Sequence, residues 1–173
     1  DCEVTVIDGD KFEDRNKERQ RFTSCENKAD HTVNQLKLQF PKVHIRSKGE
    51  YVTDDNIIST VRENDLVFLC VDNHATRKLV SDRCEELENV TLISGGNDYT
   101  DGNVILYRRK DGKDVGRPPT KMYSKIAKPE DKNPGVLTDA ERQGCQQEAI
   151  NKPQLLFTNL AIASAMLICY YAV

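Results

Sequence analysis

Apolar residues occur along this chain in two patterns: short runs, and longer stretches in which they recur every three or four positions. The short runs predict strands over residues 4–7, 43–45, 66–71, 90–94 and 103–107. The helical period predicts helices between them, over residues 25–40, 53–61 and 74–87. The run over 66–71 has no polar interruption, which is typical of a strand buried on both faces. Strands and helices that alternate in this way predict an α/β fold. We expect a Rossmann-like, doubly wound and mainly parallel sheet with helices on both faces.

Two stretches depart from this alternation. Residues 109–137 are rich in Lys, Pro, Gly and Asp, and we expect a long mobile loop there. Residues 153–173 begin with proline and are mostly apolar, which predicts a C-terminal helix. That helix is long enough to span a bilayer, but polar residues such as Gln154 and Asn159 dilute its apolar character. We therefore favour a helix buried in the core or against a second copy of the chain, and no membrane contact.

Length and composition indicate one domain over residues 1–173, of ordinary globular character. Hydrophobic residues make up 38% and charged residues 31% of the chain. The net charge of −3 argues against broad nucleic-acid binding. None of the six cysteines forms a C-x-x-C pair, so zinc-ribbon spacing is absent and we expect no structural zinc. This cysteine usage and the lack of a visible signal peptide favour a reducing, cytoplasmic setting.

The densest polar chemistry follows the first predicted strand. Asp8 and Asp10 end it, separated by a glycine that permits a turn. In open α/β sheets ligands bind at the carboxyl ends of the strands, where an acid can accept a ribose hydroxyl. Asn16, Arg19 and Gln20 come next, and Arg19 lies one helical turn after Asn16, suited to a phosphate. The alternative is a strand end followed by a solvated, charged helix.

Further polar residues stand at the ends of later elements. Lys28, within the next predicted helix, would by itself be an ordinary solvated residue. Asp72 and Asn73 follow the buried run, and Asp72 could simply cap the next helix. Arg77 comes one turn later and could pair with a neighbouring acid or contact a ligand. Ser94-Gly95-Gly96 closes the following strand.

In order and spacing, these motifs resemble the ThiF/MoeB family, the superfamily that includes the ubiquitin-activating enzymes. The matching pieces are D-x-D at residues 8–10, N-x-x-R-Q at 16–20, the lysine at 28, D-N-x-x-x-R at 72–77 and Ser-Gly at 94–95. Each piece is weak alone, and their common order makes the resemblance specific. It runs from Val4 to the C-terminus and is weakest across residues 109–140.

The resemblance implies an activity: ATP-dependent, Mg²⁺-dependent adenylation of the C-terminal carboxylate of a ubiquitin-like or sulfur-carrier protein. It also implies roles by position, with Asp10 on the ribose, Asn16, Arg19 and Lys28 on the phosphates, and Asp72 on magnesium. Asp8, Gln20 and Asn73 would complete the nucleotide site. Positioning and charge neutralisation suffice for such chemistry, so Arg19, Lys28 and Asp72 would be the catalytic groups.

Cys145 stands just before the final helix, where some family members keep a cysteine that receives the activated carboxylate. It would need an accessible thiolate of lowered pKa. The alternative, to which we give equal weight, is that Cys145 is an ordinary loop cysteine without a role in the reaction.

The chain also departs from the family pattern. A Rossmann-like site needs a glycine-rich loop after its first strand, and none precedes Val4. We therefore expect a strand–loop segment of roughly 20–30 residues before Asp1 in the intact protein. A non-catalytic scaffold or pseudo-enzyme subunit is the main alternative function. A nicotinamide-dependent dehydrogenase is a third, although it would leave Asn16, Arg19 and Lys28 without a purpose. We expect a homodimer.

Overall fold

The computed structural model describes residues 3–12, 26–97, 101–142 and 156–173. The chain splits into two compact units, Asp1–Val52 and Thr53–Val173, and each is described by itself. Arg19, Asn16, Gln20 and Cys145 lie outside the described residues.

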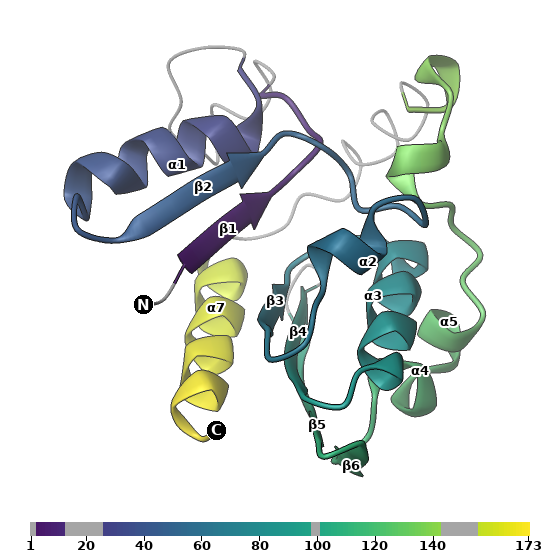
Figure 1. Ribbon diagram of the computed structural model, residues 1–173. Helices are drawn as coiled ribbons and strands as arrows, with labels where there is room; N and C mark the ends of the chain where they lie inside the picture. Colours follow the sequence, from purple (N-terminus) through teal and green to yellow (C-terminus); the bar gives the residue numbers. More distant parts are fainter. Residues whose placement is uncertain (1–2, 13–25, 98–100, 143–155) are drawn as a thin grey trace. The chain divides into compact units, whose positions relative to one another are not determined.

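The first unit is a strand–helix–strand unit. Its elements are β1 (Glu3–Ile7), α1 (Lys28–Gln39) and β2 (His44–Lys48). The two strands are parallel, with Val4 opposite Ile45, and α1 packs along them (Figure 1). Ala29 and Val33 of α1 are buried together with Ile45 of β2, so the apolar face predicted from the helical period is the face that packs.

The second unit is built on a mixed sheet in the order β3-β4-β5-β6, in which β6 covers Lys113–Val115. Its first elements, in chain order, are α2 (Ile57–Thr60), β3 (Leu66–Leu69), α3 (His74–Glu86), β4 (Val90–Asn97) and β5 (Gly102–Lys110). β3 and β4 are parallel and joined by α3, whereas β5 and β6 add antiparallel pairs. Figure 1 shows α3 and the C-terminal helix α7 (Leu156–Tyr171) on opposite sides of this sheet. The expected α/β class, with parallel strands and helices on both faces, is confirmed.

β3 is less buried than its apolar sequence predicts. Leu66 and Phe68 are 39% and 42% exposed, so the expectation of a strand buried on both faces is wrong here. Among the described strands β3 has a single neighbour, β4, and it therefore lies at the edge of its sheet. An apolar run indicates that a strand is suited to burial. It does not indicate whether the strand lies at the centre or at the edge of the sheet.

Residues 109–137 do not form one long loop. The stretch contains β6 (Lys113–Val115), α4 (Pro119–Met122), α5 (Ser124–Ala127) and the 3-10 turn η2 (Pro134–Val136). Pro118, Pro119 and Ile126 are buried, and α4 and α5 pack against α3. The helices are each a single turn, too short to show a helical period, which explains why the sequence pattern missed them.

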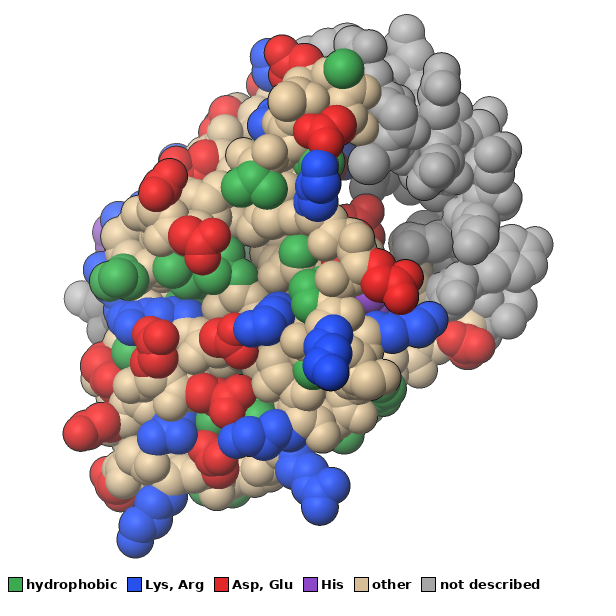
Figure 2. Space-filling view, turned by 90° about the vertical axis from the view of Figure 1, so that its right-hand side faces the viewer, with side chains coloured by type: hydrophobic (Ala, Val, Ile, Leu, Met, Phe, Trp, Pro, Cys, Tyr) green, Lys and Arg blue, Asp and Glu red, His purple; other side chains and the backbone are tan. Residues whose placement is uncertain are grey.

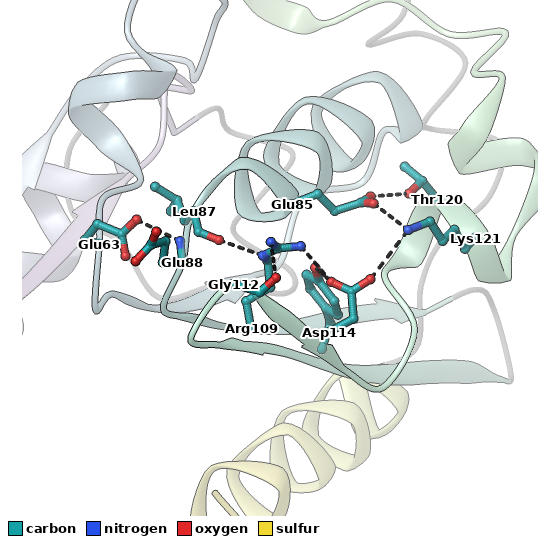
Figure 3. A network of polar contacts seen from close by, with 10 residues as sticks. Glu63, Glu85, Leu87, Glu88, Arg109, Gly112, Asp114, Thr120 and Lys121 are labelled. Atoms are coloured by element: carbon teal, nitrogen blue, oxygen red, sulfur yellow. Dashed lines mark hydrogen bonds and ion pairs between the residues drawn. The ribbon is translucent and has the colours of Figure 1, made fainter.

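A polar network holds the start of this stretch against the sheet (Figure 3). Arg109 donates to the carbonyl oxygens of Leu87 (2.6 Å) and Gly112 (2.6 Å) and to Asp114 Oδ1 (2.8 Å). The fully buried Tyr107 also donates to Asp114 Oδ1 (2.8 Å). Desolvation by burial and this hydrogen bond raise the pKa of Tyr107, and the same bond lowers the pKa of Asp114. The β5–β6 hairpin is therefore tied to the end of α3 by a hydrogen bond from a charged side chain, that of Arg109.

α7 is only partly buried, so the expectation of a helix buried in the core of this chain is wrong, and burial against a second copy stays a prediction. Leu160 and Leu167 are 59% and 54% exposed, whereas Met166 is buried. The buried side lies on β4 and β5 at positions without side chains, since a Cβ at Gly95 would collide with Met166 Sδ and one at Gly102 with Ile162. Among the described helices, none combines the length and apolar content that a bilayer crossing requires.

Candidate functional site

A cluster of polar side chains surrounds the carboxyl end of β1. Asp8, Gly9 and Asp10 follow the strand directly, and the Asp8 side chain accepts a hydrogen bond from the backbone N–H of Asp10 (2.8 Å). Lys28 Nζ lies 2.8 Å from Asp10 Oδ2 and forms an ion pair with it. The hydroxyl of Tyr51 donates to Asp10 Oδ1 at 2.5 Å. The structure thus brings three of the predicted site residues, Asp8, Asp10 and Lys28, together at the end of β1.

Asn27 holds this arrangement in place. Its side-chain NH₂ donates to the carbonyl oxygens of Asp8 (2.7 Å) and Asp10 (3.0 Å). Its side-chain oxygen accepts from the N–H groups of Ala29 (2.8 Å) and Asp30 (3.2 Å), which makes Asn27 the N-cap of α1. The same side chain therefore starts the helix and ties it to the strand end, and Lys28, the first residue of α1, is directed at Asp10 as a result.

Tyr51 is a site residue that the sequence analysis missed. It stands 41 residues from Asp10, after β2, and no local pattern marks it. Its ring lies where a side chain at position 9 would be, because a Cβ built on Gly9 would be 2.5 Å from the ring carbons. Glycine at position 9 thus permits this packing in addition to the turn.

A second group of predicted residues lies at the carboxyl end of β3, in the other unit. Asn73 is buried and is the N-cap of α3, since its side-chain oxygen accepts from the N–H of Thr76 (2.8 Å). The alternative that Asp72 caps this helix is therefore wrong, and Asp72 is exposed. Asn73 was predicted as a nucleotide contact, and the contact that the structure describes for its side chain is this helix cap.

Arg77 makes contacts other than the ion pair with a neighbouring acid that the sequence suggested, and its contact with a ligand stays a prediction. Its guanidinium donates to Ser94 Oγ (2.9 Å) and to the carbonyl oxygens of Gly95 (2.7 Å) and Val71. Burial lowers its pKa, opposed by the nearby Cys70, Asp72 and Asp131. Arg77 therefore joins the ends of β3 and β4 and orders the backbone immediately before Asp72.

Asp131 is the second residue that the sequence analysis missed. Its two carboxylate oxygens accept from the N–H groups of His74 (2.7 Å) and Ala75 (3.0 Å), the first residues of α3. A carboxylate at this end of a helix is stabilised by the unpaired N–H groups and the helix dipole. The residue comes from the stretch expected to be a loop, at a sequence separation of 56–57 residues, which no local signal reveals.

The two groups of residues lie in different units, Asp10 in the first and Asp72 in the second. Because each acid follows a strand of the predicted sheet, the sequence also predicts that the two acids border one crevice, and this stays a prediction. Within the described part of the chain, no group of three or more His, Cys, Asp or Glu side chains is arranged to hold a metal ion. Figure 2 shows acidic and basic side chains interspersed over one face of the molecule.

The sequence profile of the ThiF family matches residues 2–168 of the chain. The chain belongs to the ThiF family. The resemblance drawn from D-x-D, N-x-x-R-Q and D-N-x-x-x-R is thereby confirmed at the level of the family.

Two individual relatives match part of the chain in sequence. The chain is 31% identical over 107 residues to the adenylyltransferase and sulfurtransferase uba4 of Pyricularia oryzae, a match covering 60% of this chain and 22% of that protein. It is 27% identical over 113 residues to the adenylyltransferase and sulfurtransferase MOCS3 of Culex quinquefasciatus, covering 63% and 26%. The chain thus spans about a quarter of the length of these relatives.

Solved structures agree on the fold. The crystal structure of E. coli MccB matches with a TM-score of 0.60 and 17% identity, over 94% of this chain and 45% of MccB. MccB with SeMet MccA matches with a TM-score of 0.59, 16% identity and the same coverage.

Proposed function

We propose that this chain carries the nucleotide site of an enzyme that uses ATP and Mg²⁺ to adenylate the C-terminal carboxylate of a ubiquitin-like or sulfur-carrier protein. The observation that carries the proposal is the Asp10–Lys28 ion pair at the carboxyl end of β1, in a chain of the ThiF family. The relatives named as adenylyltransferases and the MccB structure with MccA support a protein or peptide substrate.

Asp10 and Lys28 are assigned to the two ends of a nucleoside phosphate. Asp10 accepts a hydrogen bond from a ribose hydroxyl, since a carboxylate after a parallel strand lies where such sheets bind their ligands. Lys28 supplies a positive charge for the phosphates and stands at the start of α1, where N–H groups and the helix dipole also favour an anion. Asn27 positions both residues, because it bonds the backbone of Asp10 and caps α1.

Asp72 is assigned to magnesium. Its carboxylate is exposed and lies three residues after the end of β3, and Mg²⁺ in nucleotide sites is held by one or two carboxylates together with phosphate oxygens and waters. When bound, the ion would neutralise phosphate charge. Arg77 holds the carbonyl of the preceding residue, Val71, and so orders the backbone that presents Asp72.

Asn16 and Arg19 are proposed as further phosphate ligands, Gln20 as a further residue of the nucleotide site, and Cys145 as the acceptor of the activated carboxylate. A cytoplasmic location is part of the proposal, supported by the free thiols of Cys70, Cys84 and Cys169. The homodimer remains a prediction for measurement in solution.

The test is ATP–pyrophosphate exchange by the intact gene product, assayed with candidate carrier proteins of its own proteome. Asp72→Ala should abolish exchange and leave the far-ultraviolet circular dichroism spectrum unchanged. Asp55→Ala is the matched control, because Asp55 is also an exposed acid of the second unit and should have no effect. Exchange at the parent rate in Asp72→Ala would refute the enzyme assignment and favour a scaffold subunit.

Cys145 is tested in the same assay. Cys145→Ala should retain exchange and lose any covalent carrier adduct seen by non-reducing electrophoresis. An adduct that persists in this variant would make Cys145 an ordinary loop cysteine.

A further inference from the structure

Both oxygens of the Asp10 carboxylate are held by side chains from other parts of the first unit. Lys28 Nζ lies 2.8 Å from Oδ2, and the Tyr51 hydroxyl lies 2.5 Å from Oδ1. The second distance is at the short end for a hydroxyl bonded to an ionised carboxylate, a strong class of hydrogen bond. The terminal torsion of an aspartate is broad, so such partners decide the direction in which the carboxylate faces.

The position of the Tyr51 ring is set by packing as well as by this bond. The ring occupies the space beside Gly9, and a methyl group at position 9 would lie 2.5 Å from ring carbons. These carbons are Cγ and the two Cδ atoms, which lie next to Cβ rather than at the hydroxyl end, so the whole ring would have to move. Gly9 and the phenol hydroxyl together hold Tyr51 over the end of β1.

We propose that Tyr51 is a positioning residue for nucleotide binding, which orients the Asp10 carboxylate toward the ribose. The inference rests on the proposed function, in which Asp10 accepts a hydrogen bond from a ribose hydroxyl. Lys28 fixes one oxygen of the carboxylate and Tyr51 the other, and two fixed oxygens define its plane. Without the phenol hydroxyl, rotation about the last torsion of Asp10 would misalign it with the hydroxyl.

The experiment compares the dissociation constants of ATP, 2′-deoxy-ATP and 3′-deoxy-ATP, each with Mg²⁺, for the intact gene product and its variants. Tyr51→Phe keeps the ring and removes the hydroxyl. It should weaken ATP binding about tenfold, the size expected when a hydrogen bond to a charged group is compromised. It should weaken the deoxy analogue that lacks the Asp10-bound hydroxyl far less, because that analogue has already lost the contact.

Tyr123→Phe is the matched control. Tyr123 is also partly exposed but lies in the second unit, between α4 and α5, and its substitution should leave all three constants unchanged.

Gly9→Ala gives a second, independent route to the same effect. The added methyl group should displace the Tyr51 ring and reproduce the selective loss of ATP binding. The Gly9→Ala, Tyr51→Phe double variant should then lose little more than either single variant, because both act through one contact.

Two results would overturn the proposal, and they are distinct from each other. An equal loss for ATP and both deoxy analogues in Tyr51→Phe and Gly9→Ala would reduce Tyr51 to a purely structural residue. Parent protein that binds none of the three nucleotides would refute the proposed function itself.

Discussion

Replacing Arg77 with methionine would remove the guanidinium that joins β3 to β4 while keeping most of the apolar stem. Arg77 is 7% exposed and donates to Ser94 Oγ and to the carbonyl oxygens of Gly95 and Val71. The substitution therefore tests whether these polar contacts stabilise the end of the sheet that presents Asp72.

The size of the effect follows from which acceptors become unpaired. Ser94 and Gly95 are both buried, and a buried acceptor that loses its partner costs about 1–3 kcal/mol. Val71 is only half-buried, so water can replace part of its lost bond. Removing a buried charge offsets some of this loss. We expect a net destabilisation of about 2–4 kcal/mol, which for a chain of this length lowers Tm by roughly 5–15 °C.

The assay is thermal unfolding at neutral pH, followed by circular dichroism. Lys78→Met is the matched control, because Lys78 is the next residue of α3 and pairs with Asp82 at the surface. Exposed ion pairs contribute about 0–1 kcal/mol. If Arg77→Met lowers Tm no more than Lys78→Met, the contacts of the buried guanidinium do not hold the two strand ends together.

Three further predictions concern the stretch after β5 and the core of α3. Asp131→Ala should destabilise the protein by about 1 kcal/mol in urea unfolding, because it removes the carboxylate from the start of α3. The control Glu130→Ala should leave the stability unchanged, and equal effects of the two substitutions would contradict the assignment of Asp131. The hydrogen bond from Lys132, with those from the neighbouring threonine, lowers the pKa of Glu141 from 4.5 to about 2. Because the folded pKa is depressed, this stabilisation is present above about pH 4.5 and lost toward pH 2; an NMR titration should show the low midpoint, and Lys132→Met should raise it. Burial raises the pKa of the Cys84 thiol to about 12, so Cys84 should react with a thiol reagent only as fast as the protein unfolds, and rapid labelling of the native protein would count against its burial.

The sequence was most informative where neighbours along the chain determine the structure. The period of apolar residues located α1 and α3, since the same spacing that shows an amphipathic helix decides which face packs. Short apolar runs located β1, β3 and β4 for a similar reason. The acids after β1 could be placed at a strand end because they follow it directly in the chain.

The sequence was least informative where a contact joins distant segments through polar groups. Tyr51 reaches Asp10 across 41 residues, and Asp131 reaches α3 across 56–57. The single-turn helices α4 and α5 have no period to detect, and the bond from Arg109 to the Leu87 carbonyl joins residues 22 positions apart. The exposure of α7 was also missed, because an apolar composition does not say which side of a helix finds a neighbour.

By itself, then, the sequence determined the strands β1 to β5, the main helices, the family and the acids at the strand ends, because each depends on residue types at short, fixed spacing. Only the tertiary structure decided what those residues touch. It placed Lys28 and Tyr51 on the carboxylate of Asp10, made Asn73 rather than Asp72 the cap of α3, and turned Arg77 toward backbone carbonyls. The physical reason is that a hydrogen bond depends on distance and direction in space, and residues far apart in the chain meet those conditions only after the strands and helices have packed.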